Sequence, residues 1–225
     1  MTIIPLNQIQ AVLFDLDGTL IETDDQAVSR LERRLRPFLQ AHAPQTARWL
    51  MMKAETPGNA LITLLDWLHL DLPLMGFTDG LRRRRGVYPA PEFQLIAGVE
   101  EMLLALAPHY PLALVTTRSR YHIDQFLLRF PQLADVFTTT CGLQDTRRLK
   151  PHPEPLYLAA DRLGVPITQC LMVGDTTMDV LAGRRAQAWS AAVLCGFGER
   201  AELSRAGAHF ILDSTAELTA RLLPA

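Results

Sequence analysis

The chain has 225 residues, 48% of them hydrophobic and 20% charged, with a formal net charge of -2. These values exclude a disordered or collagen-like chain and are typical of one globular domain, or of a core with a modest insertion. A pI near 6.3 gives no basic surplus for nucleic acid, and the arginine run at residues 82–85 is typical of a solvated helix face.

No apolar stretch approaches the roughly 20 residues that are needed to span a bilayer, and residues 1–10 lack the pattern of a secretory signal. The cysteines Cys141, Cys170 and Cys195 are too widely spaced for a CxxC metal site. We therefore expect a cytoplasmic monomer or homodimer with buried free thiols, and no nucleic-acid or membrane partner.

Short apolar runs alternate with amphipathic ones over most of the chain, which is typical of βα units that build a parallel sheet. We predict strands over residues 11–14, 112–115, 136–138, 170–173 and 191–194, with an edge strand at 209–212. Apolar residues at helical spacing predict helices over residues 98–107, 121–130, 155–163, 178–186 and 214–222. The fold class is therefore α/β.

One region interrupts this alternation. Between residues 23 and 92 no strand-like run occurs, and leucines recur at spacings of three and four. We predict an all-helical cap over residues 23–92, inserted between the first two strands of a core formed by residues 1–22 and 93–225. The proline-rich residues 87–91 would form the return linker.

The first predicted strand runs directly into Asp15, Asp17 and Gly18, at the edge of the sheet where open α/β folds bind ligands. Asp15 and Asp17 would point to the same side of a continuing strand, and two close carboxylates need a cation or a shared proton. A hard, oxygen-seeking ion such as Mg²⁺ would meet this need. A plain surface turn is the alternative interpretation.

Polar groups also follow the strand predicted at residues 112–115. Thr116 supplies a hydroxyl, and the backbone at Thr117 an N–H group, that can donate to a phosphate oxygen. Further on, prolines on both sides of His152 would fix a loop and direct the Lys150 side chain. The charge of Lys150 could then hold a phosphate and a nucleophile together. A helix cap and a solvent-facing lysine are the alternatives.

A second acidic pair, Asp175 and Asp179, follows the strand predicted at residues 170–173. These carboxylates would supply further oxygen ligands for a metal ion. Asp179 also has capping-box spacing from Thr176, so it could serve only to start a helix. The four groups together combine a nucleophile, a hydroxyl, a cation and acidic ligands at the ends of separate strands.

These segments resemble the four motifs of the haloacid dehalogenase-like hydrolase superfamily, in particular its phosphoglycolate phosphatase and β-phosphoglucomutase subgroup with a helical cap. The matching segments are DLDGT at residues 15–19, VTT at 115–117, LKPHPE at 149–154 and GDTTMD at 174–179. The resemblance extends to residues 96–103, 182–188 and 195–199. It thus covers nearly all of the predicted core.

The resemblance implies a Rossmann-like parallel-sheet core with helices on both faces and an inserted helical cap. It also implies that Asp15 attacks phosphorus and forms an aspartyl phosphate, with Asp17 as general acid and base. Mg²⁺ would be bound by Asp15, by the backbone carbonyl of Asp17 and by Asp175.

The phosphoryl oxygens would be bound by Thr116, by the backbone at Thr117 and by Lys150, while Asp179 would support the metal site or Lys150. Within the cap, residues 55–59 resemble the position of a specificity loop. Asn59 and Lys53, and one of the arginines at 82–85, are therefore candidate contacts to the leaving group. An ordinary turn between two helices is equally compatible with this segment.

We expect a Mg²⁺-dependent phosphatase for a small phosphorylated metabolite, with phosphoglycolate or a sugar phosphate as the first candidates. A phosphomutase and a catalytically silent binding protein of the same family are the alternatives. Dehalogenase members lack the second aspartate of the first motif, so Asp17 favours phosphoryl chemistry over carbon–halogen cleavage.

Overall fold

The computed structural model describes residues 8–22 and 93–223. The chain divides into two compact units, Met1–Glu22 with Tyr88–Ala225 and Thr23–Val87. The described helices and strands belong to the first unit. The predicted cap helices, with Lys53, Asn59 and residues 82–85, lie outside the described residues, so they stay predictions.

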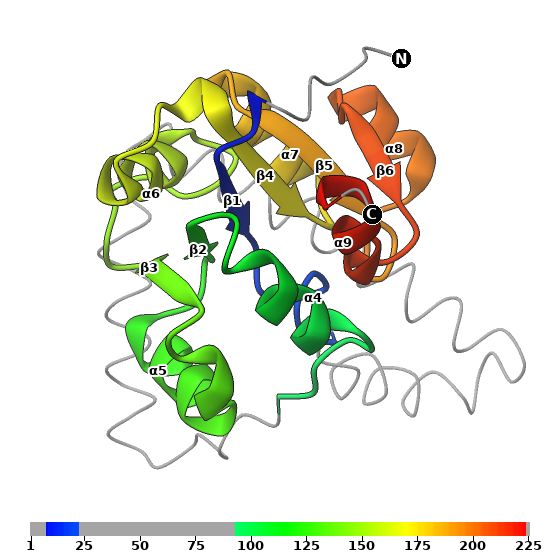
Figure 1. The fold of residues 1–225 in the computed structure, drawn as a ribbon. Helices are drawn as coiled ribbons and strands as arrows, with labels where there is room; N and C mark the ends of the chain where they lie inside the picture. The colour runs from blue at the N-terminus through cyan, green and yellow to red at the C-terminus, as the bar shows by residue number, and fades with distance from the viewer. Residues whose placement is uncertain (1–7, 23–92, 224–225) are drawn as a thin grey trace, which may run out of the picture. The chain divides into compact units, whose positions relative to one another are not determined.

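Within the described residues, six parallel strands form one sheet in the order β3-β2-β1-β4-β5-β6 (Figure 1). The strands are β1 (Ala11–Phe14), β2 (Leu112–Val115), β3 (Phe137–Cys141), β4 (Cys170–Gly174), β5 (Trp189–Val193) and β6 (Phe210–Leu212). From β1, the order runs through β2 and β3 to one edge and through β4, β5 and β6 to the other. Ligands of such sheets bind outside the carboxyl ends of the strands, beside the point where the order reverses.

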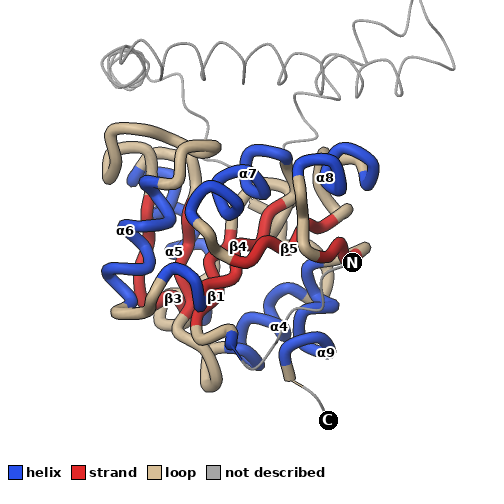
Figure 2. Tube along the Cα trace, turned by 90° about the horizontal axis from the view of Figure 1, so that it is seen from above, coloured by secondary structure: helices blue, strands red, loops and turns tan. Residues whose placement is uncertain are grey.

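Helices cover both faces of the sheet (Figure 2). One face carries α4 (Val99–Leu106), α5 (Arg120–Arg129) and α9 (Leu218–Leu222). The other carries α6 (Glu154–Leu163), α7 (Thr177–Ala186) and α8 (Arg200–Ala206). Alternate residues of β1 explain the two cores, because Val12 and Phe14 pack with the first group, whereas Ala11 and Leu13 pack with the second.

The α/β fold class with a Rossmann-like parallel sheet is confirmed, and β1 and β2 have the predicted bounds. β3 differs, because it starts one residue later than predicted and continues through Thr139 and Thr140 to Cys141. These polar residues are compatible with a strand because β3 lies at the edge of the sheet, where the Thr140 hydroxyl accepts a hydrogen bond from Arg120 at 2.6 Å.

The helix predicted over residues 214–222 begins as a 3₁₀ turn, Thr215–Glu217, and continues as α9. The predicted capping box is present, since the Ser214 backbone N–H donates to Glu217 Oε1 at 3.2 Å. Two further 3₁₀ turns lie at Pro131–Leu133 and Ile167–Gln169. In the described ranges, no helix is both long enough and apolar enough to cross a membrane.

Candidate active site

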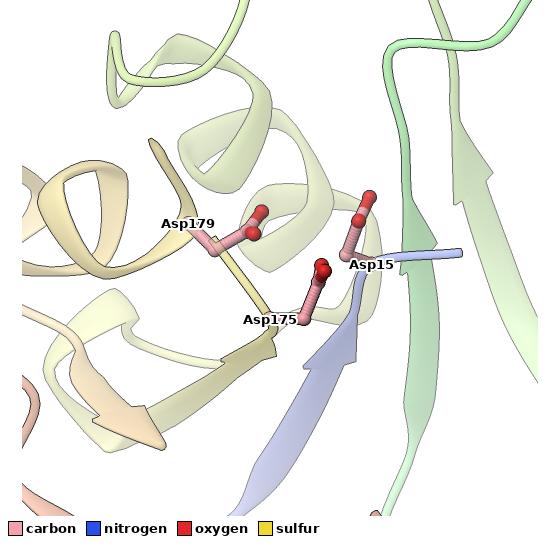
Figure 3. Close-up of side chains that lie close together, drawn as sticks. All are labelled: Asp15, Asp175 and Asp179. Carbon is pink, nitrogen blue, oxygen red and sulfur yellow. The ribbon is translucent and has the colours of Figure 1, made fainter. Parts of the chain in front are cut away.

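Three carboxylates, those of Asp15, Asp175 and Asp179, lie together beyond the carboxyl ends of β1 and β4 (Figure 3). One oxygen of each lies within 4.8 Å of those of the other two, and all three residues are buried. Asp15 directly follows β1, Asp175 directly follows β4, and Asp179 lies in the first turn of α7. Because β1 and β4 are adjacent and parallel, their ends bring the first two carboxylates together.

The ammonium group of Lys150 binds two of these carboxylates. Its Nζ donates to Asp15 Oδ1 at 2.6 Å, to Asp179 Oδ1 at 2.7 Å and to the carbonyl oxygen of Val115 at 2.9 Å. An ammonium has three protons, so these acceptors use all of them. A phosphate oxygen would have to replace one acceptor to bind Lys150 directly, and the predicted phosphate contact stays a prediction.

Side chains around the Lys150 loop hold its backbone in place. The Lys150–Pro151 peptide bond is cis, and the Pro151 carbonyl accepts a hydrogen bond from Arg185 at 2.9 Å. On the other side, the Thr146 hydroxyl donates to the Arg148 carbonyl at 2.9 Å. The loop thus positions Lys150 with its side chain only 4% exposed.

Asp175 is enclosed by two loops that come from distant parts of the sequence. Its Oδ2 accepts a hydrogen bond from the Phe197 backbone N–H at 2.8 Å, and Thr19 Oγ1 donates to its Oδ1 at 3.5 Å. A Cβ atom on Gly18, whose φ is 68°, or on Gly196 would overlap the Asp175 carboxylate. These glycines let the backbone approach the carboxylate closely.

Phe197 and Gly196 are site residues that sequence reasoning did not assign. The signal was the pair of glycines in Cys195-Gly196-Phe197-Gly198, directly after the last long strand. Glycines in such a place indicate a close approach of the backbone to another group.

Asp179 has both of the roles that its sequence position allows. Its Oδ2 accepts hydrogen bonds from the Thr176 backbone N–H at 3.1 Å and from the Thr176 hydroxyl at 2.7 Å, which closes the start of α7. Its Oδ1 accepts from Lys150. The helix start therefore fixes the carboxylate that holds Lys150.

The Asp17 carboxylate is not a member of the buried acidic group. Arg118 binds it as a fork, with Nε at 2.8 Å from Oδ2 and Nη2 at 2.6 Å from Oδ1. Its side chain is 32% exposed. β1 ends at Phe14, so the side chains of Asp15 and Asp17 are not held on the same side, as they would be in a continuing strand. The expected crowding around Asp15 therefore comes from Asp175 and Asp179, while the metal contact predicted for the Asp17 carbonyl stays a prediction.

Thr116 lies at the end of β2, next to β1, and is buried. Its Oγ1 accepts a hydrogen bond from the Arg118 backbone N–H at 3.1 Å, and its own N–H donates to the Cys141 carbonyl at 2.9 Å. The hydroxyl proton of Thr116 thus remains a possible donor to a ligand. Thr117 is exposed at the same strand end.

Burial dominates the electrostatics of the acidic group. It raises the pKa of Asp15 to about 7, with Asp179 and Asp17 adding to the rise and Lys150 opposing it. Burial and the carboxylates of Asp179 and Asp15 raise the pKa of Asp175 well above its usual range. Burial lowers the pKa of Lys150, but the Asp15 and Asp179 carboxylates outweigh it and raise this pKa above its usual value.

When all three carboxylates are ionised, the one ammonium leaves an excess of negative charge in a buried place. A bound cation would compensate this charge, and carboxylate oxygens are the ligands that a hard divalent ion such as Mg²⁺ prefers. The residues present therefore fit a divalent metal.

The family can be assigned from the sequence as a whole. Residues 12–193 match the model of the haloacid dehalogenase-like hydrolases. This chain belongs to that family. The family predicted from the sequence is confirmed. The four sequence segments that resemble its motifs supply the residues that meet at the strand ends.

Named relatives of this haloacid dehalogenase-like hydrolase include phosphatases. A phosphoglycolate phosphatase of Xanthomonas campestris is 31% identical over 191 residues, which are 84% of each chain. The pyrophosphatase PpaX of Bacillus cereus is 28% identical over 221 residues, 94% of this chain and 95% of the relative. A solved HAD family hydrolase from Deinococcus radiodurans R1, with bound phosphate and sodium, has a TM-score of 0.69 and 27% identity over 96% of this chain and 95% of its own. The predicted enzyme class, a phosphatase of this family, is confirmed.

The structure brings some of the predicted site residues together and places others further away. Those that meet in the buried group are Asp15, Lys150, Asp175 and Asp179. Asp17 lies outside that group, and Thr116 lies at the neighbouring strand end.

Proposed function

We propose that this hydrolase is a Mg²⁺-dependent phosphatase that cleaves a small phosphorylated metabolite through an aspartyl phosphate on Asp15. The observation that carries the proposal is the Lys150 ammonium between the Asp15 and Asp179 carboxylates, with Asp175 in the same buried group. This arrangement combines an oriented nucleophile with oxygen ligands for a metal.

Asp15 is oriented for attack through one of its oxygens. Lys150 binds Oδ1, and no donor to Oδ2 lies within residues 8–22 and 93–223. We assign Oδ2 as the nucleophile that forms the bond to phosphorus while the ester oxygen leaves with its electron pair. Water then cleaves the aspartyl phosphate, which releases inorganic phosphate and restores Asp15.

Asp15, Asp175 and the backbone carbonyl of Asp17 would hold the Mg²⁺ ion, and Asp179 would support them through Lys150. Bound there, the ion supplies positive charge that keeps the carboxylates ionised and stabilises charge on the phosphoryl oxygens. Burial alone favours the neutral form of Asp15, whose pKa is raised to about 7. The Lys150 ammonium acts in the opposite direction and favours the ionised nucleophile.

Proton transfer and phosphate binding are assigned to the residues around this group. Asp17 protonates the leaving oxygen and then takes a proton from the attacking water. Thr116 donates its hydroxyl proton to a phosphoryl oxygen, together with the backbone N–H at Thr117. Phosphoryl transfer depends mainly on positioning and on charge stabilisation, so these contacts supply most of the catalysis.

Phosphoglycolate and sugar phosphates are the first candidate substrates. The similarity to the phosphoglycolate phosphatase of Xanthomonas campestris supports the first, while the similarity to pyrophosphatase PpaX adds pyrophosphate to the test set. The cap over residues 23–92, with Lys53 and Asn59, is proposed to select among them. A cytoplasmic location and a monomeric or homodimeric state remain predictions.

The test measures phosphate release from p-nitrophenyl phosphate, 2-phosphoglycolate, glucose phosphates and pyrophosphate. We expect turnover with Mg²⁺, loss of turnover in excess EDTA, and a fall in kcat of about 10⁴-fold for Asp15→Asn. Asp213→Asn is the matched control, because Asp213 is 77% exposed and pairs with Arg200. It should leave kcat unchanged.

Two outcomes would contradict this assignment. Folded protein that releases no phosphate in the presence of Mg²⁺ would indicate a silent binding protein. Interconversion of sugar phosphates without phosphate release would indicate a phosphomutase.

A further inference from the structure

Arg118 is fixed at the active site by contacts on all of its parts. Its backbone N–H donates to Thr116 Oγ1 at 3.1 Å, and its carbonyl accepts from the Leu143 N–H at 2.9 Å. Its guanidinium lies over the Phe93 ring, 5.7 Å from the ring centre, and binds Asp17 as a fork. The guanidinium therefore has a set position and orientation before any substrate binds.

The position of Asp17 indicates what Arg118 can reach. If Asp17 protonates the ester oxygen, the leaving group must lie against the Asp17 carboxyl. The nitrogens of Arg118 lie only 2.6 and 2.8 Å from the oxygens of that carboxyl. Atoms just beyond the ester oxygen would therefore lie beside Arg118, whose side chain is 25% exposed and so accessible to a ligand.

The charges nearby favour an anion as the ligand of this guanidinium. The Asp17 carboxylate and the buried acidic group would repel a negatively charged leaving group, and the Arg118 guanidinium beside Asp17 can offset this repulsion. A guanidinium fork matches the geometry of a carboxylate or a phosphate, so such a group can take the place of Asp17 on Arg118. A neutral leaving group cannot make this exchange.

We propose that Arg118 binds a second negatively charged group on the substrate and thereby releases Asp17 to face the ester oxygen. The substrate class is then a phosphorylated compound whose leaving group carries its own carboxylate or phosphate. This inference rests on the proposed phosphatase function and goes beyond it by naming the charge of the leaving group and the residue that binds the charged group.

The test compares Arg118→Gln with the wild-type protein on three probes with Mg²⁺. 2-Phosphoglycolate has a carboxylate leaving group, pyrophosphate a phosphate one, and ethyl phosphate a neutral one. The measured quantity is the ratio of kcat/KM for each anionic probe to kcat/KM for ethyl phosphate. We expect this ratio to fall about 30-fold in Arg118→Gln, mainly through KM, since a charged hydrogen-bond fork is lost.

Two further variants separate recognition from folding. Arg118→Lys keeps the charge but not the fork, so part of the ratio should return. Arg120→Gln is the matched control two residues away, where the arginine is 47% exposed and pairs with Asp145 and Thr140. It should leave both activity and the ratio unchanged.

An unchanged ratio in folded Arg118→Gln would overturn the inference. If Arg118→Gln does not fold, the ratio of kcat/KM for each anionic probe to kcat/KM for ethyl phosphate in the wild-type protein decides. A ratio below about 5 for both anionic probes counts against the inference. A fall for one anionic probe alone supports the inference and identifies a carboxylate or a phosphate as the bound group. Wild-type protein that hydrolyses none of the esters would contradict the proposed function itself.

Discussion

The two aspartates of the first motif begin two charged regions that differ in burial and in charge balance. Asp15 belongs to the buried group, where three carboxylates lie together and one ammonium binds two of them. Asp17 belongs to an ion pair with Arg118, and both side chains are a quarter to a third exposed. A buried excess of charge needs a ligand from outside the chain, whereas a balanced and accessible pair can open without a large cost.

The difference also separates the roles of two residues of the same type. Burial raises the pKa of Asp15 to about 7, so its ionised form depends on the cations around it. Within the described residues, the Asp17 carboxylate is held by Arg118 at the edge of the site, and it can exchange this partner for another. In the proposed mechanism, the environment, not the residue type, thus distinguishes the nucleophile Asp15 from the proton donor Asp17.

Lys150→Met would be the most severe test of the buried group. The change leaves three carboxylates without their internal cation, so the free energy of unfolding in metal-free buffer should fall by about 3–5 kcal/mol. Activity with Mg²⁺ should fall by about 10³-fold or more, because Asp15 loses the group that orients it. Urea denaturation and phosphate release would measure the two effects.

Arg200→Met is the control for an ion pair outside this site. Arg200 and Asp213 are 57% and 77% exposed, so the unfolding free energy should change by no more than about 0.5 kcal/mol. A loss for Lys150→Met as small as this would refute the importance of the buried ammonium.

Asp175→Asn should stabilise the metal-free protein while it removes activity. The raised pKa values of Asp15 and Asp175 mean that the folded protein binds more protons than the unfolded chain. Stability of the metal-free wild type should therefore fall as the pH rises from about 4 to about 7. Asparagine removes one charge and keeps an acceptor for the Phe197 N–H, so at pH 8 the variant should be more stable than the wild type.

Added Mg²⁺ would sharpen this comparison. At a concentration of a hundred times its Kd, the ion should stabilise the wild type by about 2.7 kcal/mol and leave Asp175→Asn nearly unchanged. Thermal unfolding at pH 5 and pH 8, with and without Mg²⁺, measures both effects. Equal metal stabilisation of the two proteins would place the metal site elsewhere.

Gly196→Ala should have the smallest effect. The new Cβ would overlap the Asp175 carboxylate and displace it, which should weaken Mg²⁺ binding by about 10-fold. Gly164→Ala is the matched control, because Gly164 has a φ of 68° and open space around it. It should cost about 1 kcal/mol in stability and leave Mg²⁺ affinity, measured by calorimetry, unchanged.

Much of the core could be predicted because its strands are short apolar runs with clear boundaries. β1 and β2 are buried on both faces, so the first polar residue after each marks its end. The meeting of Asp15 with Asp175 followed from the same pattern, since carboxyl ends of parallel strands share one edge. The polar end of β3 could not be predicted in this way, because its threonines depend on its edge position.

The contacts that sequence reasoning missed join side chains or backbone groups far apart in the chain. Arg118 reaches Asp17 across 101 positions, and nothing in either segment specifies that pairing. The donor to Asp175 at Phe197 is a backbone N–H, which every residue except proline carries. Gly196 and Gly198, which flank Phe197, indicate that the backbone closely approaches another group, but the sequence does not identify that group.

β1, which precedes the other described strands in the chain, lies inside the sheet, between β2 and β4. During synthesis on a ribosome, Asp15 leaves the exit tunnel long before its partners, since Lys150 follows it by 135 positions and the Asp175 donor Phe197 is later still. A nascent or truncated chain that ends before these segments cannot assemble the centre. Hydrolytic competence thus arises only after the segment around Phe197 has been made, and fragments that end before it are expected to be inert.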